Sequence, residues 1–222
     1  MDTKLQLQIR LFGRPEFYRG PVLLPSLATH KTQSLLAFLI LRRDRPHSRD
    51  ELSALFWGDQ TQERARHSLA TALWRIRRLI SPDEYLLADA AAVQFDGDRD
   101  YWLDTAEFEK LLNASRDDKP AIDQLRQAVE LYRGDLLEGF YDDWCIEERY
   151  RLESLYLDAL NCLVAAYEAQ GDPAAVLAHA RKHLAHDPLQ ESLYLAVMRA
   201  FIALGDDAAA RHEWQRCCEV RQ

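Results

Sequence analysis

The sequence has no apolar run long enough to cross a membrane, and its first residues lack the charged-then-apolar pattern of a secretory signal. The longest apolar run covers residues 35–41, whereas a spanning helix needs about 20 residues. The four cysteines (Cys145, Cys162, Cys217 and Cys218) show no CxxC spacing, and an adjacent pair is poorly placed for a disulfide. We therefore expect a cytoplasmic protein with reduced thiols and no membrane partner.

Motifs of catalytic and phosphate-binding sites are also missing. No Gly-rich phosphate loop follows a strand-like segment, and no GxSxG nucleophile motif occurs. The acidic pairs at residues 142–143 and 147–148 have no nucleophile nearby, so we interpret them as solvated or partner-facing charge. We expect no enzyme, no catalytic residue and no cofactor.

Three histidines form the one candidate for a metal site. His179, His183 and His186 fall at i, i+4 and i+7 along one predicted helix, a spacing that can gather imidazoles around a transition metal. The dipeptide at 187–188, Asp-Pro, ends that helix at once, and no cysteine or second-helix ligand accompanies it. We interpret these side chains as surface histidines and expect no metal.

The net charge of −8 is unevenly distributed. Residues 1–95 hold 14 Lys and Arg against 10 Asp and Glu, whereas residues 96–222 hold 14 against 26, which gives +4 and −12. This asymmetry favours two domains with different partners, because phosphate suits the first part and is repelled by the second. Two solvated surfaces are the alternative.

The N-terminal part predicts a small sheet followed by helices. Residues 5–11 alternate apolar and polar, as in a half-buried strand, and two short runs at 16–19 and 22–24 suggest a small antiparallel sheet. A helix is predicted over about 31–43. The capping box at 48–51 then starts a second helix that buries Leu52, Leu55 and Phe56.

The third predicted helix, from about residue 61 to 80, is the most informative. Its apolar residues lie within one narrow sector: Ala65, Leu69, Ala72, Leu73, Ile76 and Ile80. The opposite face carries basic, hydrogen-bonding and aromatic side chains: Arg64, His67, Thr71, Trp74, Arg75 and Arg78. These residue types suit a DNA major groove, where Arg contacts guanine, Thr contacts bases or phosphates, and Trp packs on the backbone. The alternative is an ordinary solvated helix face, although an exposed Trp favours a partner.

Two short strands around residues 85–89 and 92–96 predict a closing hairpin. A sheet, three helices and a hairpin, in that order, make a winged helix-turn-helix. The hairpin tip at 88–92 has neither glycine nor a basic residue, so we do not expect it to contact the minor groove.

Beyond a polar junction at residues 96–100 the pattern is helical throughout. Gly171-Asp172 recurs as Gly205-Asp206, an offset of 34 residues that is the period of tetratricopeptide repeats. The expected fold is therefore mainly α with a small β-sheet: an N-terminal winged helix-turn-helix at 1–97 and a C-terminal tetratricopeptide-like all-α repeat domain at 98–222.

Several stretches in this order resemble the Streptomyces antibiotic regulatory protein (SARP) family, whose DNA-binding domain is of the response-regulator type. In the first part these are residues 30–39, 48–59 and 69–78. In the second part the resemblance is to the bacterial transcriptional activator domain, through residues 103–108, 131–137, 144–149 and 185–191. The domain of the family continues past its last helix, so we expect a longer regulator than the 222 residues given.

The resemblance implies a transcription activator that binds double-stranded DNA with the helix beginning near Thr61 and recruits RNA polymerase. It also implies that the loop at 57–62 touches the polymerase, through Trp57, Asp59 and Gln60. Trp57 has an equally good interpretation as a core residue between the second and third helices. We expect a monomer that forms a homodimer on DNA, because one winged helix makes few base contacts. The alternative function is a protein-interaction scaffold whose winged helix does not bind DNA.

Overall fold

The computed structural model describes residues 6–80, 85–114 and 122–220 and divides the chain into two compact units. The first comprises Met1–Thr105 and Gly134–Arg149, and the second comprises Ala106–Arg133 and Tyr150–Gln222. The predicted fold class is confirmed: helices dominate both units, and the strands form two small sheets in the first. The units do not follow the predicted division after residue 97, because a later segment packs with the first unit.

A four-stranded sheet opens the first unit, in the order β3-β2-β1-β7. Strand β1 (Leu7–Arg10) pairs antiparallel with β2 (Glu16–Arg19), which pairs antiparallel with β3 (Val22–Leu23), as the sequence predicted. The fourth strand, β7 (Tyr101–Leu103), pairs parallel with β1 and was not predicted. The chain thus returns to the first sheet directly after the expected polar junction.

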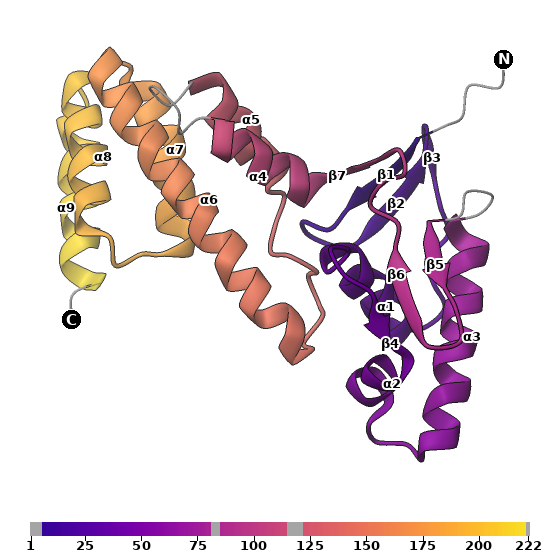
Figure 1. The fold of residues 1–222 in the computed structure, drawn as a ribbon. Helices are drawn as coiled ribbons and strands as arrows, with labels where there is room; N and C mark the ends of the chain where they lie inside the picture. The colour runs from indigo at the N-terminus through magenta and orange to yellow at the C-terminus, as the bar shows by residue number, and fades with distance from the viewer. Residues whose placement is uncertain (1–5, 81–84, 115–121, 221–222) are drawn as a thin grey trace, which may run out of the picture. The chain divides into compact units, whose positions relative to one another are not determined.

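Three helices follow the first sheet: α1 (His30–Leu41), α2 (Arg49–Trp57) and α3 (Gln62–Ile80) (Figure 1). Helix α2 begins as the capping box predicts, because Glu51 N donates to Ser48 Oγ over 3.0 Å. Its buried residues differ in part from the expected set. Leu52 and Phe56 are buried as expected, but Leu55 is exposed, and Trp57 is buried instead.

The predicted hairpin is present as β5 (Leu86–Ala88) and β6 (Ala92–Phe95), which pair antiparallel. The two-residue strand β4 (His47–Ser48) extends it on the side of β6. Val93 and Phe95 are fully buried, so β6 ties the hairpin to the helical core. Together with α1–α3 this sheet completes the winged helix-turn-helix.

A buried carboxylate joins the end of β7 to the chain after β1. Asp104 accepts the N–H of Leu11 on both oxygens at 2.9 Å and the N–H of Phe12 at 3.0 Å. It is 1% exposed, so the backbone N–H groups replace the water that the charge loses. Residues 11 and 104, which are far apart in sequence, are held together in the core of the first unit.

The segment Gly134–Arg149 packs on the same unit and is organised by one guanidinium. Arg149 donates to the carbonyl oxygens of Leu136, Leu137 and Phe140 at 2.7–3.0 Å. Leu137 has a φ of 53°, the sole described residue other than glycine with positive φ, and its N–H donates to the Leu11 carbonyl at 2.9 Å. These bonds hold a loop that sequence periodicity left undefined.

Contacts between this segment and α1 are aromatic and polar. The ring of Phe140 stacks on His30 at 3.8 Å between centroids, and Trp144 packs edge-on against Phe38 at 5.3 Å. Ser34 Oγ donates to Asp142 Oδ2 over 2.8 Å. Asp142, expected to be solvated or partner-facing, is therefore held by α1.

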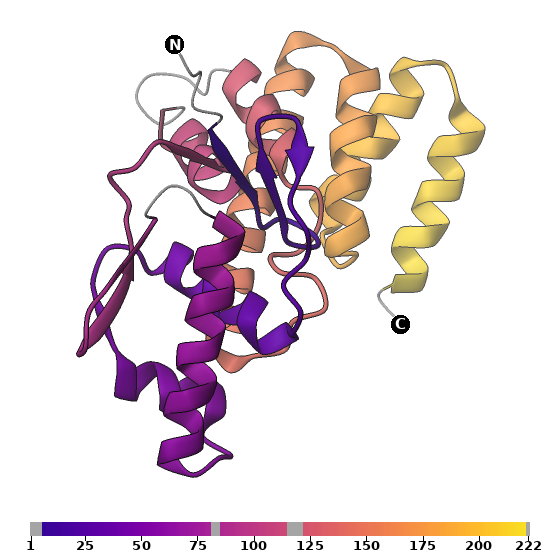
Figure 2. The same ribbon diagram turned by 90° about the vertical axis from the view of Figure 1, so that its right-hand side faces the viewer.

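The second unit is all-helical. It contains α4 (Asp104–Ala114, from residue 106), α5 (Ile122–Leu131), most of α6 (Asp143–Gln170), α7 (Pro173–His186), α8 (Glu191–Ala203) and α9 (Asp207–Val220). Figure 2 shows α7, α8 and α9, orange to yellow, as a row of antiparallel helices. None of the described helices has the length and apolarity that crossing a bilayer requires.

The 34-residue repeat appears as two equivalent turns. At the first, Asp172 N donates to Tyr167 O and Asp172 Oδ1 accepts from Ala175 N, both at 3.0 Å. At the second, Asp206 N donates to Phe201 O and Asp206 Oδ1 accepts from Ala209 N, both at 2.9 Å. The preceding glycines have φ of 70° and 79°, as a Schellman cap requires. Each turn ends one helix and caps the next.

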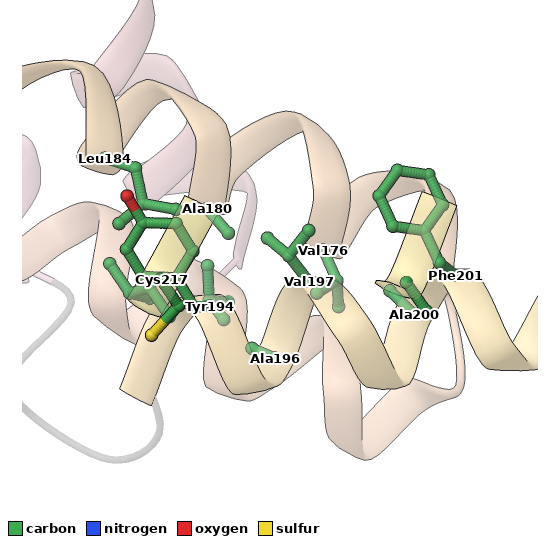
Figure 3. Close-up of a cluster of buried hydrophobic side chains, with 12 residues drawn as sticks. Val176, Ala180, Leu184, Tyr194, Ala196, Val197, Ala200, Phe201 and Cys217 are labelled. Carbon is green, nitrogen blue, oxygen red and sulfur yellow. The ribbon is translucent and has the colours of Figure 1, made fainter. Parts of the chain in front are cut away.

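The core of this repeat lies between α7 and α8, with contributions from α6 and α9 (Figure 3). It contains Val176, Ala180 and Leu184 of α7 and Tyr194 and Val197 of α8, all less than 10% exposed. The repeat thus buries one continuous apolar layer, as stacked helix pairs do.

Candidate nucleic-acid interface

Helix α3 is positioned by its apolar stripe. All six residues predicted to face inward are buried, with Leu69, Ile76 and Ile80 at 1% exposure or less. At the C-terminal end of α3, Arg19 Nη2 donates to the Ile80 carbonyl at 2.8 Å, which pairs an otherwise open helix-end oxygen. These contacts set the rotation of α3 about its own axis and therefore determine which side chains form the opposite face.

The six predicted DNA-contact residues lie together on that opposite face. Arg64, His67, Trp74 and Arg78 are exposed, while Thr71 and Arg75 are half-buried. Trp74 is 60% exposed, and the guanidinium of Arg78 lies 5.6 Å from its ring centroid. At 100° per residue the six side chains share a sector of about 100°. Their role in binding DNA stays a prediction.

The arginines on this face of α3 differ from the neighbouring Arg66 in whether they form an ion pair. Among described residues, no carboxylate pairs with Arg64, Arg75 or Arg78. Arg66, which lies off the face, contacts Asp50 at 3.1 Å. Charge without a counter-ion in the protein is what phosphate groups neutralise.

The wing tip is built around an aspartate. Asp89 Oδ1 accepts from Ala91 N at 2.7 Å and from Ala92 N at 2.8 Å. These backbone bonds, first that of Ala92 and then that of Ala91, lower the pKa of Asp89 below its ordinary value. The turn is an Asx type and has no positive φ, which explains why its sequence has no glycine.

A basic side chain reaches the wing tip from elsewhere. Arg49, the first residue of α2, donates through Nε to the Asp89 carbonyl at 2.8 Å. The hairpin sequence lacks a cation, but the folded wing has one beside it. Periodicity did not reveal this residue, because its partner lies 40 positions away.

The three residues predicted to contact RNA polymerase differ in their exposure to solvent. Asp59 and Gln60 are exposed, whereas Trp57 ends α2, is 6% exposed and packs against Phe56. The structure thus supports the core interpretation of Trp57. The turn needs Gly58, because a Cβ there would lie 2.6 Å from the Ala54 carbonyl oxygen.

Both exposed loop residues have polar neighbours. Asp59 Oδ1 lies 3.2 Å from Lys31 Nζ, with the carboxylate side chain 70% exposed. Ser68 Oγ donates to Gln60 Oε1 at 3.0 Å, which links the loop to the start of α3. A surface ion pair of this kind contributes little to stability, at most about 1 kcal/mol.

The three candidate histidines of α7 do not converge. His179 stacks on Tyr167 at 5.2 Å, and its Nδ1 bonds the Ala175 carbonyl oxygen at 2.8 Å. His186 Nδ1 lies 3.4 Å from Glu153 Oε1. His183 is 2% exposed, so its interpretation as a surface histidine was wrong. Burial lowers its pKa below the ordinary value.

Comparison with known proteins agrees with this architecture. The family model described as "Bacterial transcriptional activator domain" matches residues 103–221. The regulatory protein AfsR of Streptomyces coelicolor is 28% identical over 193 residues, which cover 83% of this chain and 19% of AfsR. The chain thus spans about a fifth of the length of that curated relative.

A solved structure is similar in fold. EmbR of Mycobacterium tuberculosis, determined in complex with a low-affinity phosphopeptide, superposes with a TM-score of 0.75 at 23% identity. The match covers 96% of this chain and 59% of EmbR. The resemblance to SARP-type regulators is confirmed by these matches together. Because the family model covers more than half of the 222 residues, this protein belongs to the family defined by the bacterial transcriptional activator domain.

Proposed function

We propose that this chain binds double-stranded DNA sequence-specifically through α3 and activates transcription by recruiting RNA polymerase. The observation that carries the proposal is the outer face of α3, where three arginines that pair with no carboxylate among the described residues share one sector with an exposed tryptophan. The family and the SARP-type architecture agree with it. The site of action is then the cytoplasm, where bacterial DNA and polymerase meet.

The DNA contact is tested first by finding the bound sequence. Genomic fragments captured by the full chain and sequenced supply an operator, on which affinities of variants are measured at several salt concentrations. Arg64→Ala or Arg75→Ala is expected to weaken binding by about 1–3 kcal/mol if the residue reads a base. Affinity must fall as salt rises, because phosphate contacts release counterions.

A matched control removes the same charge from another side of the helix. Arg77 is exposed on α3 but lies outside the sector of the predicted contacts. Arg77→Ala is expected to change specificity much less than Arg75→Ala. Equal operator affinity for wild type and both face variants, or salt-independent binding, would favour the protein-interaction scaffold instead.

The polymerase contact is assigned to the exposed part of the α2–α3 loop, Asp59 and Gln60. These residues flank the start of α3, so a polymerase bound to adjacent DNA lies within reach. Asp59→Ala is expected to lower transcript yield in vitro while operator affinity stays unchanged. Lys31→Met is the control, because it breaks the same ion pair but keeps the carboxylate.

The outcomes of that test are distinct. A parallel loss of binding and transcription in Asp59→Ala, or no change in either, removes the loop from the polymerase interface.

We further propose that two copies bind half-sites about one helical turn apart, because one winged helix makes few base contacts. A footprint limited to one half-site at saturation would contradict the pairing.

A further inference from the structure

Trp74 and Arg78 form a pair on the outer face of α3. Arg78 Cζ lies 5.6 Å from the centroid of the Trp74 ring, about one helical turn further along the chain. Side chains of a helix lean towards its N-terminus, so a residue contacts the one four positions before it. Trp74 is 60% exposed and Arg78 is also exposed. The pair therefore lies at the surface, on the side of α3 that faces away from the core.

The guanidinium of Arg78 keeps its hydrogen-bonding capacity in this pair. A cation–π contact is made with the face of the ring and uses no N–H donor. Among the described residues, neither a carboxylate nor another acceptor bonds to Arg78. All five of its N–H donors thus remain available to a ligand.

The position of the pair along α3 determines which part of a DNA duplex it can meet. Arg64 and Arg78 are 14 positions apart, which is about 21 Å along the helix axis at 1.5 Å per residue. The major groove is only about 12 Å wide, and helix-turn-helix proteins contact base edges with the N-terminal residues of the recognition helix. The last turn of α3, which contains Arg78, then lies at the phosphate backbone.

We propose that Arg78 binds a DNA phosphate and that Trp74 is the positioning residue that holds its guanidinium in place. The proposal rests on the proposed function and divides the outer face of α3 in two: the part with Arg64 reads bases, and the end with Arg78 binds the backbone of any sequence. Trp74 acts through Arg78 and does not pack on the DNA backbone itself. A guanidinium donates two parallel N–H bonds to phosphate, and holding it in one orientation lowers the entropy that binding costs.

The phosphate contact is tested by measuring the affinity of the full chain for its operator and for an unrelated duplex of equal length, each at several salt concentrations. Arg78→Ala is expected to weaken binding to both duplexes by a similar factor, because a phosphate contact carries no sequence information. The slope of log affinity against log salt concentration should become shallower by about 0.9, the share of one phosphate.

Arg77→Ala is the matched control for this measurement. Arg77 is exposed in the same last turn of α3 but lies outside the sector of the predicted contacts. No ring contact of Arg77 occurs among the described residues. Its removal lowers the charge of α3 equally and should change the salt slope much less than Arg78→Ala does.

A double-mutant cycle tests the role of Trp74. Trp74→Leu removes the ring but keeps a large apolar side chain, and it is expected to weaken binding about two- to fivefold, as the loss of an exposed cation–π contact does. Trp74→Phe keeps a ring and should retain most of the affinity. In a chain that already carries Arg78→Ala, Trp74→Leu should have no further effect, because the two side chains act as one unit. Circular dichroism confirms that each variant is folded.

Any of three results overturns the proposal. They are an Arg78→Ala variant that binds like wild type or loses affinity for the operator alone, an Arg77→Ala variant whose salt slope changes as much as that of Arg78→Ala, and a Trp74→Leu loss that is the same with and without Arg78. These results leave the proposed function intact, whereas a wild type that binds neither duplex refutes both.

Discussion

Replacing Asp104 by alanine removes the carboxylate that joins β7 to the chain after β1. Its two oxygens accept from Leu11 N, Phe12 N and Thr105 N at 2.8–3.0 Å. Leu11 and Phe12 are fully buried, so water cannot reach the two N–H groups that the substitution leaves without this acceptor. We expect the first unit to lose much of its stability.

The magnitude follows from those two groups. A buried backbone N–H without an acceptor costs about 1–3 kcal/mol, so two of them cost roughly 2–6 kcal/mol. The whole stability of a domain is about 5–15 kcal/mol, which makes this a large fraction. Asp104→Asn keeps one accepting oxygen and should lose about half as much.

Urea unfolding followed by tryptophan fluorescence measures the effect. Four of the five tryptophans, Trp57, Trp74, Trp102 and Trp144, belong to the first unit. The control is Asp98→Ala, an exposed carboxylate in the nearby turn, which should change stability by less than about 0.5 kcal/mol. If Asp104→Ala unfolds at the same urea concentration as Asp98→Ala, the account of Asp104 as the acceptor for buried N–H groups is wrong.

Other substitutions probe the remaining parts of the structure. Leu69→Ala should destabilise the first unit by roughly 2–5 kcal/mol through a cavity under α3, and a thermal melt at unchanged temperature would contradict this. Arg149→Lys keeps the charge, but one ammonium nitrogen cannot replace both Nε and Nη2, which donate to three carbonyls, so we expect earlier urea unfolding of the first unit. Because burial lowers the pKa of His183 below 6.5, the unfolded chain binds more protons in acid, and stability of the second unit should fall as pH drops below about 6.5. His183→Leu should make that pH dependence shallower than in wild type, although Asp158, His186 and Asp187, which interact electrostatically with position 183, remain in place.

Local patterns in the sequence predicted the elements that depend on interactions between residues close in sequence. The stripe from Ala65 to Ile80 predicted which face of α3 is buried, because side chains three and four apart share one side of a helix. The capping box at Ser48, the hairpin and the 34-residue repeat were likewise predicted from neighbours within one turn or one helix pair. The outward face with Arg64 and Arg75 follows from the same periodicity.

Tertiary structure decided what depends on partners distant in sequence. Trp57 and His183 are buried at 6% and 2% exposure by tertiary packing, which a residue's own sequence neighbours do not encode. Asp104 binds N–H groups 92 and 93 positions away, and Arg49 reaches a wing tip 40 positions away. Hydrogen bonding of buried charge is decided by whichever backbone groups the fold brings near. The inclusion of Gly134–Arg149 in the first unit therefore emerged from the packing, while periodicity had placed that segment with the helical repeat.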